Sequence, residues 1–132
     1  MIIKDEDKKV SGMFHFVSHD AVSLEEFIKN IPRKGNFKFK QESPIVHIVC
    51  KSPEDAEKML KKSQETGWKR SAIISFGNNI VAELIGTEKL DFPLIKNGKL
   101  LVSEEFLKII LEKANKNLEK GWKKIEKLTK SV

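Results

Sequence analysis

The stretch IVHIVCKSPED, which spans residues 45–55, contains the boundary between a strand and a helix. Its first part, residues 45–50, is a nearly continuous apolar and β-branched run, as is typical of a strand in the centre of a sheet. Ser52 then supplies a helix N-cap, and Pro53 suits the first helical position. We therefore expect a central strand that leads directly into a helix, with Gly67 placed to end that helix.

Shorter β-branched and aromatic runs on both sides of this stretch predict further strands. The sequence FKFK at residues 37–40 alternates apolar and charged residues, so we expect a strand there with one face toward water. Gly77-Asn78-Asn79 separates two such runs and predicts a hairpin loop. A short edge strand is expected within residues 90–102. The remaining strands are expected at 13–17, 72–76 and 80–85.

Two more helices are indicated by residues that cap helix N-termini. Ser23 and Glu26 form a capping box, and Pro32 ends the run that follows. Ser103, followed by two glutamates, opens the last and longest helix. The element order β-α-β-β-α-β-β-(β)-α predicts an α+β fold, with a mixed β-sheet, three helices packed on it and a long basic C-terminal helix. We expect a single domain over residues 1–132.

The composition excludes several classes of protein. With 132 residues, 39% of them hydrophobic, the chain can bury a core without disulfides. Cys50 is the only cysteine, which excludes a disulfide framework and a zinc site built on cysteine pairs, and we expect a buried strand thiol. His15 and His47 lie inside expected strands and no cysteine pair is present, so we expect no metal site. No apolar stretch approaches the roughly 20 residues of a membrane span, and we expect a cytoplasmic protein.

Most of the excess positive charge lies in the last helix. The net charge is +6, and residues 108–130 hold eight lysines against three glutamates. Two sets of residues recur there at spacings of three and four, as residues on one side of a helix do. The apolar set is Leu107, Leu111, Ala114, Leu118, Trp122, Ile125 and Leu128. The basic set, which we call the lysine row, is Lys113, Lys116, Lys120, Lys123, Lys127 and Lys130.

The lysine row is expected to face water. Each lysine lies two residues, or about 200° of rotation, from an apolar position, so the apolar set is expected to pack on the sheet. At about 1.5 Å per residue, the row extends over several phosphate spacings of a nucleic acid. Binding of a polyanion, RNA above all, is one interpretation. An ordinary solvated helix face is the other.

Residues whose side chains can take part in chemistry follow the strand expected at 13–17. His19 lies between Ser18 and Asp20 where the strand gives way to a loop. An imidazole in that position can act as a general base or as a hydrogen-bond donor near neutral pH. Residues adjacent in sequence point in different directions, so the run is no hydrolase triad. A structural role for His19 is the alternative.

A second candidate segment, Gly67-Trp68-Lys69-Arg70-Ser71, joins the second helix to the next strand. It places an aromatic ring next to two cations, where a base can stack and a phosphate can pair. The alternative is that Trp68 packs in the core and that the cations are solvated.

These segments together resemble a known family, the wybutosine-synthesis methyltransferases. The resemblance extends from about residue 14 to about residue 130 and consists of short matches in the family's order. The matches are Phe14-His15-Phe16-Val17-Ser18-His19-Asp20, Pro44-Ile45-Val46-His47, Ser52-Pro53-Glu54-Asp55-Ala56, Gly67-Trp68-Lys69-Arg70-Ser71, Leu100-Leu101-Val102 and Lys113-Ala114-Asn115. The resemblance implies an S-adenosylmethionine-dependent enzyme that methylates N4 of the tricyclic guanine derivative beside the anticodon of phenylalanine tRNA.

The family's second functional motif, Trp-x-x-x-Ser/Lys-His, matches Phe14, Ser18 and His19, with phenylalanine in place of tryptophan. Its first motif, Ser-x-Ser-Ser-x-Gly-Arg, has no counterpart in these 132 residues. On this resemblance, His19 acts as base or orients the substrate, and Ser18 donates a hydrogen bond to the base or cofactor. Arg70 and Ser71 contact a phosphate or the cofactor carboxylate. Further expected binding residues are Phe14, Trp68, which stacks on a base, and the lysine row, which holds the tRNA backbone.

Three interpretations of function follow. The first is a short member of this family, active alone or with a second polypeptide that supplies the first motif. The second is a non-catalytic RNA-binding homologue, or one half of a split enzyme. The third is that the basic face docks on an acidic protein.

Overall fold

The computed structural model describes residues 1–5 and 13–131, which form eight strands and three helices. The residues group into two compact units. The first unit contains residues 1–42 and 89–118, and the second contains residues 43–88 and 119–132. The last helix, α3 (Glu104–Ser131), contributes its first part to one unit and its last part to the other. The expectation of a single domain remains a prediction, and each unit is described by itself.

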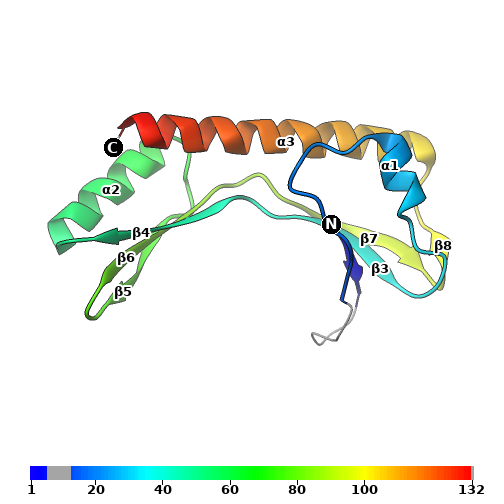
Figure 1. Ribbon diagram of the computed structural model, residues 1–132, viewed down its shortest axis with the longest axis horizontal. Helices are drawn as coiled ribbons and strands as arrows, with labels where there is room; N and C mark the ends of the chain where they lie inside the picture. The colour runs from blue at the N-terminus through cyan, green and yellow to red at the C-terminus, as the bar shows by residue number, and fades with distance from the viewer. Residues whose placement is uncertain (6–12, 132) are drawn as a thin grey trace. The chain divides into compact units, whose positions relative to one another are not determined.

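The first unit is built on an antiparallel sheet with the strand order β2-β1-β3-β7-β8, and Figure 1 labels β3, β7 and β8 of this sheet. Its strands are β1 (Ile2–Lys4), β2 (Phe14–Phe16), β3 (Phe37–Gln41), β7 (Leu90–Lys96) and β8 (Lys99–Leu100). Strand β1 was missing from the sequence-based prediction, because three residues are too few to show an alternation. Residues 90–102, expected to add a short edge strand, form two strands: the seven-residue β7, which lies inside the sheet, and the two-residue β8, which is at its edge.

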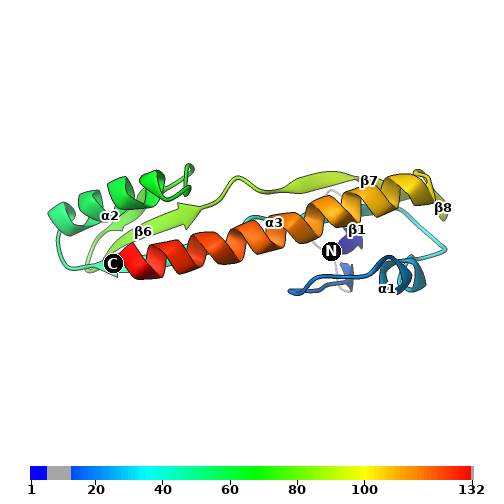
Figure 2. The same ribbon diagram turned by 90° about the horizontal axis from the view of Figure 1, so that it is seen from above.

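The core of the first unit forms where α1 (Leu24–Lys29) and the first part of α3 cover one face of this sheet (Figure 2). Phe27 of α1, Phe39 of β3 and Leu107 of α3 are all buried there. The predicted alternation in β3 is confirmed, because Phe37 and Phe39 are buried and Lys38 and Lys40 are not. The predicted helix start is confirmed as well, since the Ser23 side chain accepts a hydrogen bond from the next turn.

The second unit has a three-stranded antiparallel sheet with the order β4-β6-β5. Its strands are β4 (Ile45–Cys50), β5 (Ala72–Phe76) and β6 (Ile80–Ile85), and its own helix is α2 (Pro53–Glu65). In Figure 1 this helix runs along the sheet in green. Trp68, Ala82, Leu84 and Leu128 form the buried core, so α2 and the last part of α3 cover the same face of the sheet.

The expectation that residues 45–50 form a central strand was wrong. Strand β4 lies at the edge of its sheet and its exposure alternates, with Ile45 55% and Val49 65% exposed. The predicted hairpin between β5 and β6 is present, and it places β6 rather than β4 in the centre. A continuous apolar run does not report how many faces of a strand are covered, and here helices cover one face only.

The predicted α+β class, with three helices and a long basic C-terminal helix, is confirmed. The strands form two antiparallel sheets instead of one mixed sheet, because every strand pairing in the described residues is antiparallel. Cys50, expected to be buried, is a partly buried free thiol at the edge of the second core. Among the described helices, none is both long and apolar enough to cross a membrane.

The buried face of α3 departs from the predicted apolar stripe beyond residue 118. Trp122 is 49% exposed and Ile125 is exposed as well, whereas Asn117 and Gly121 are buried. A Cβ atom at position 121 would lie 3.3 Å from Cγ of Pro44, which is an unusually tight contact, so the glycine lets the helix approach Pro44 closely. The helix therefore turns Gly121 inward, and the buried face shifts by one position at residues 117 and 121 before it returns to the predicted stripe at the buried Leu128.

Candidate functional site

The loop that follows β2 holds His19 at the surface of the first unit. The Ser18 hydroxyl accepts a hydrogen bond from the Asp20 N–H at 3.2 Å and donates one to the Asp20 carbonyl oxygen at 3.0 Å. This is the local turn that serine hydroxyls commonly stabilise. His19, at the tip of the turn, is exposed. Ser18 thus holds the turn from which the imidazole is presented.

The other end of this loop is fixed by Asn115 of α3. Its side-chain oxygen accepts from the Val22 N–H and its side-chain nitrogen donates to the Val22 carbonyl oxygen, each at 3.1 Å. Asn115 closes one of the matched segments, yet sequence reasoning assigned it no role, because nothing in a helix pattern indicates which loop an amide contacts. With β2 paired to β1 before the turn, the loop that carries His19 is held at both ends.

Phe14 offers an apolar surface near this loop. It begins β2, the edge strand of its sheet, and its side chain is 61% exposed. The neighbouring His15 instead contacts Phe37 edge to face, with ring centroids 5.3 Å apart. The exposed ring of Phe14 is therefore available to stack on a planar ligand.

Trp68, Arg70 and Ser71 belong to the second unit, so the structure does not gather them with Ser18 and His19 in one unit. Trp68 is 0% exposed within the core, which means that core packing, and not base stacking, is its role here. The Ser71 hydroxyl donates to the Trp68 carbonyl oxygen at 2.7 Å. The Arg70 side chain is exposed, while its backbone N–H is bonded to the carbonyl oxygen of Ile85 at 3.2 Å.

All six residues of the lysine row are exposed, as the sequence predicted. Lys113 and Lys116 lie in the part of α3 that belongs to the first unit, and the other four lie in the second. A basic surface of this kind suits the phosphate backbone of a nucleic acid, which positions a protein without reading sequence.

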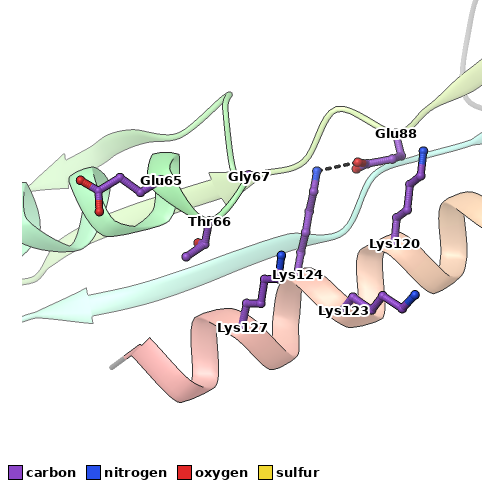
Figure 3. Close-up of a pocket in the computed structure, with 8 residues that line it drawn as sticks. All are labelled: Glu65, Thr66, Gly67, Glu88, Lys120, Lys123, Lys124 and Lys127. Atoms are coloured by element: carbon purple, nitrogen blue, oxygen red, sulfur yellow. Dashed lines mark hydrogen bonds and ion pairs between the residues drawn. The ribbon is translucent and has the colours of Figure 1, made fainter.

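Three residues of the row line a pocket of about 420 Å³ in the second unit (Figure 3). The pocket lies between α3 and the end of α2, where Gly67 follows the helix. Its lining comprises Glu65, Thr66, Gly67, Glu88, Lys120, Lys123, Lys124 and Lys127. Sequence reasoning missed Lys124 and Glu88 as site residues, although the spacing of Lys120, Lys123, Lys124 and Lys127 places four lysines on one helix face.

Lys124 and Glu88 form a largely buried ion pair in this pocket. The Nζ–Oε1 distance is 2.6 Å, and the side chains are 15% and 13% exposed. Burial acts to raise the pKa of Glu88, but the hydrogen bond and charge of Lys124, with nearby backbone N–H groups, outweigh it and hold that pKa below its ordinary value. The Lys124 ammonium is therefore fixed in place by an ionised partner.

The ion pair is expected to make the second unit sensitive to acid. A carboxyl group with a lowered folded-state pKa stabilises the fold above its ordinary value of 4.5, and loses that contribution as pH falls through the folded pKa. We expect the free energy of unfolding to decrease as pH falls below 4.5, and less steeply in Glu88→Gln. Urea unfolding, monitored by tryptophan fluorescence at a series of pH values from 7 downward, measures how the free energy of unfolding depends on pH. The exposed Glu54→Gln serves as control, and equal pH slopes for Glu88→Gln and the unsubstituted protein would contradict the prediction.

Known proteins resemble this chain along its length. Residues 2–132 match the family described as Methyltransferase TYW3. Over 117 residues the chain is 35% identical to tRNA(Phe) 7-((3-amino-3-carboxypropyl)-4-demethylwyosine(37)-N(4))-methyltransferase 1 of Pyrococcus furiosus, covering 86% of this chain and 60% of the relative. A methyltransferase of that name from Thermococcus sibiricus is 32% identical over 135 residues, covering 100% and 68%. A solved Pyrococcus horikoshii structure aligns with a TM-score of 0.79 and 36% identity, covering 84% and 58%.

The chain thus spans about 60% of the length of the first of these relatives. The resemblance read from the short matches between residues 14 and 130 is confirmed by a family match that covers nearly every residue. The chain belongs to the TYW3 methyltransferase family.

Proposed function

We propose that this chain takes part in S-adenosylmethionine-dependent methylation of N4 of the modified guanine beside the anticodon of phenylalanine tRNA. The observation that carries the proposal is the family match over residues 2–132, joined to relatives named for N4 methyl transfer to a demethylwyosine in tRNA(Phe). The basic surface of α3 supports an RNA substrate, because exposed lysines bind phosphates.

His19 is the residue that we assign to the proton. Methylation of a ring nitrogen that carries hydrogen releases a proton, and an imidazole accepts protons near neutral pH. The loop that carries His19 is held at one end by the turn that Ser18 forms with Asp20. At the other end it is held by the two hydrogen bonds between Asn115 and Val22, so the imidazole is presented by a fixed backbone. Phe14, exposed on the preceding strand, stacks on the substrate base or on the cofactor adenine.

Some of the described residues suit the cofactor. Phe14 supplies an exposed aromatic face, and Arg70, which we assign with Ser71 to the cofactor carboxylate or a phosphate, is exposed as well. The lysine-lined pocket does not suit the positive sulfonium group, because its lining holds four lysines against two glutamates and is therefore positively charged. We therefore assign acceptance of the released proton to a residue of this chain, His19. We assign no step of the methyl transfer itself to its residues.

A methyl-transfer assay tests the proposed function. Purified protein is incubated with tritium-labelled S-adenosylmethionine and phenylalanine tRNA that carries the demethylated precursor. We expect label in the tRNA, either with this chain alone or after adding a polypeptide that contains the Ser-x-Ser-Ser-x-Gly-Arg motif. Phenylalanine tRNA without the precursor is the control. If the precursor tRNA binds and acquires no label under either condition, the chain is an RNA-binding relative without this activity.

A further inference from the structure

Strand β4 forms one edge of the sheet in the second unit, and its outer side is unpaired. The Gly86 N–H donates to the Pro44 carbonyl oxygen at 3.3 Å, just before β4 begins. Hydrogen-bonded pairs alternate along an antiparallel ladder, so every second residue of β4, beginning with Val46, directs its backbone groups toward β6. The other residues of the strand direct their N–H and C=O groups outward, where no strand of the described residues pairs with them. These outer residues of β4 are Ile45, His47 and Val49.

The side chains of the outer residues are exposed on the sheet face that the helices leave open. Strands β4, β5 and β6 contain no lysine or arginine. The carboxylate on this face, Glu83, lies 2.7 Å from the imidazole of His47. The cores of protein interfaces are depleted in charged residues, whereas a surface for nucleic acid needs cations. The edge therefore favours a protein strand, and not RNA, as its occupant.

Strand β4 has none of the features that usually protect an edge. Natural edge strands commonly carry a lysine, a proline or a β-bulge that prevents a further strand from pairing. Strand β5, at the other edge of this sheet, has a register shift between Ile73 and Ser75. Strand β4 contains neither lysine nor proline, and its register with β6 continues without a shift from Ile45 to Cys50. An unprotected apolar edge of this kind is a site for the addition of a strand.

We propose that the outer edge of β4 pairs with the β4 edge of a second copy of this chain, antiparallel and about a two-fold axis. His47 then faces the His47 of the second copy, and Ile45 faces the Val49 of the second copy. In this register the outer residues of both copies meet, and each facing pair exchanges two backbone hydrogen bonds. Facing residues of an antiparallel pair have their side chains on the same face of the sheet. The helices of both copies therefore cover one side of the joined sheet, and the open faces form the other.

The edge is complementary to itself in shape and in charge. The facing side chains Ile45 and Val49 are both apolar and β-branched, and such cross-strand pairs stabilise a sheet. Each His47 keeps its own Glu83 at 2.7 Å, so the two imidazoles meet beside two carboxylates and not as unpaired like charges. A slip by one residue would place the outer residues opposite residues whose backbone groups already face β6. Backbone and side chains thus specify the same register.

The interface is small, which limits its strength. Strand β4 has six residues and is about 20 Å long at roughly 3.4 Å per residue. A single strand edge is smaller than the roughly 800 Å² per partner of a standard interface, so we expect a reversible dimer with a dissociation constant in the micromolar range. The proposal depends on neither RNA binding nor methyl transfer, and either can fail without the other.

Molar mass as a function of concentration tests the dimer. In sedimentation equilibrium from about 5 to 500 μM, a range that includes weak interfaces, we expect the mass to rise from 15.1 kDa toward twice that value. Val49→Lys places a charge at the paired edge, and we expect it to raise the dissociation constant at least about tenfold. A chain that stays monomeric overturns the proposal and leaves the edge to a strand of another polypeptide.

Ile74→Lys is the matched control for Val49→Lys. Ile74 is 51% exposed on β5, away from the proposed interface, and we expect its replacement to change the dissociation constant about twofold or less. Far-UV circular dichroism verifies that both variants are folded. Equal losses of dimer in the two variants overturn the edge pairing and assign self-association to the open face of the sheet.

Crosslinking through position 47 tests the register without a disruptive charge. In a Cys50→Ala background, His47→Cys places two thiols opposite each other in a hydrogen-bonded pair with Cα atoms about 5.5 Å apart. This distance lies within the roughly 4.4–6.8 Å of disulfides, so we expect a covalent dimer on mild oxidation. Ala72→Cys in the same background lies exposed on β5 and is expected to stay monomeric. No crosslink at position 47, or equal crosslinking at both positions, overturns the proposed register.

Discussion

Replacing His19 with alanine is expected to lower the single-turnover rate of methyl transfer by about 100- to 10,000-fold, the range that general base catalysis contributes. The imidazole is exposed on a loop held by the hydrogen bonds of Ser18 and Asn115, so its loss removes the proposed proton acceptor without removing a contact of the core. Affinity for phenylalanine tRNA is expected to stay within about twofold, because in the proposed function contacts from lysines to the tRNA backbone supply most of the binding. Rates measured at saturating substrate, beside filter-binding affinities, separate these two effects.

His47→Ala is a matched control for this prediction. His47 is also exposed, but it lies on β4 of the second unit and pairs with Glu83 at 2.7 Å. We expect its replacement to leave the methyl-transfer rate within about twofold. A His19→Ala variant that retains more than about a tenth of the rate would remove His19 from the chemistry.

Replacing Trp68 with alanine is expected to lower the free energy of unfolding by about 3–5 kcal/mol, as truncation of a buried aromatic residue does. The side chain is fully buried in the second core with Ala82, Leu84 and Leu128, so truncation leaves a cavity between the sheet and its helices. Urea unfolding at pH 7, followed by far-UV circular dichroism, measures the loss. The fluorescence of the remaining tryptophan, Trp122, reports the unfolding transition independently.

Trp122→Ala is the control for that experiment. Trp122 is 49% exposed, and we expect its replacement to cost about 1 kcal/mol or less. Acrylamide is expected to quench the fluorescence of Trp68→Phe, which retains Trp122, more strongly than that of Trp122→Phe. Equal destabilisation by the two alanine variants would contradict the assignment of Trp68 to the core.

Local signals in the sequence predicted most of the elements. The bounds of β4, β5 and β6 agree with the residue runs read from the sequence, and Ser23 and Ser52 cap their helices as expected. Gly67 follows the C-cap of α2 with a positive φ. These features depend on residues within a few positions of one another, and that range is sufficient to specify capping, turn conformation and alternation.

The candidate site was predicted less completely. The exposed lysine row and the turn at Ser18 and His19 follow from spacing and from the matched segments. The ion pair of Lys124 with Glu88 joins residues 36 positions apart, and the clamp between Asn115 and Val22 joins residues 93 positions apart. Sequence spacing carries no information about such partners, because tertiary packing selects them.

The amino-acid sequence by itself determined the α+β class, the long basic helix and the family, since each depends on local periodicity or on the order of short motifs. Only the tertiary structure decided that β4 is an edge strand and that Trp68 is buried. It also decided that Gly121 lies against Pro44, which turns Trp122 outward and places Lys124 beside Glu88. The physical reason is that burial depends on which surfaces meet, and a side chain's identity does not specify the residue that will cover it.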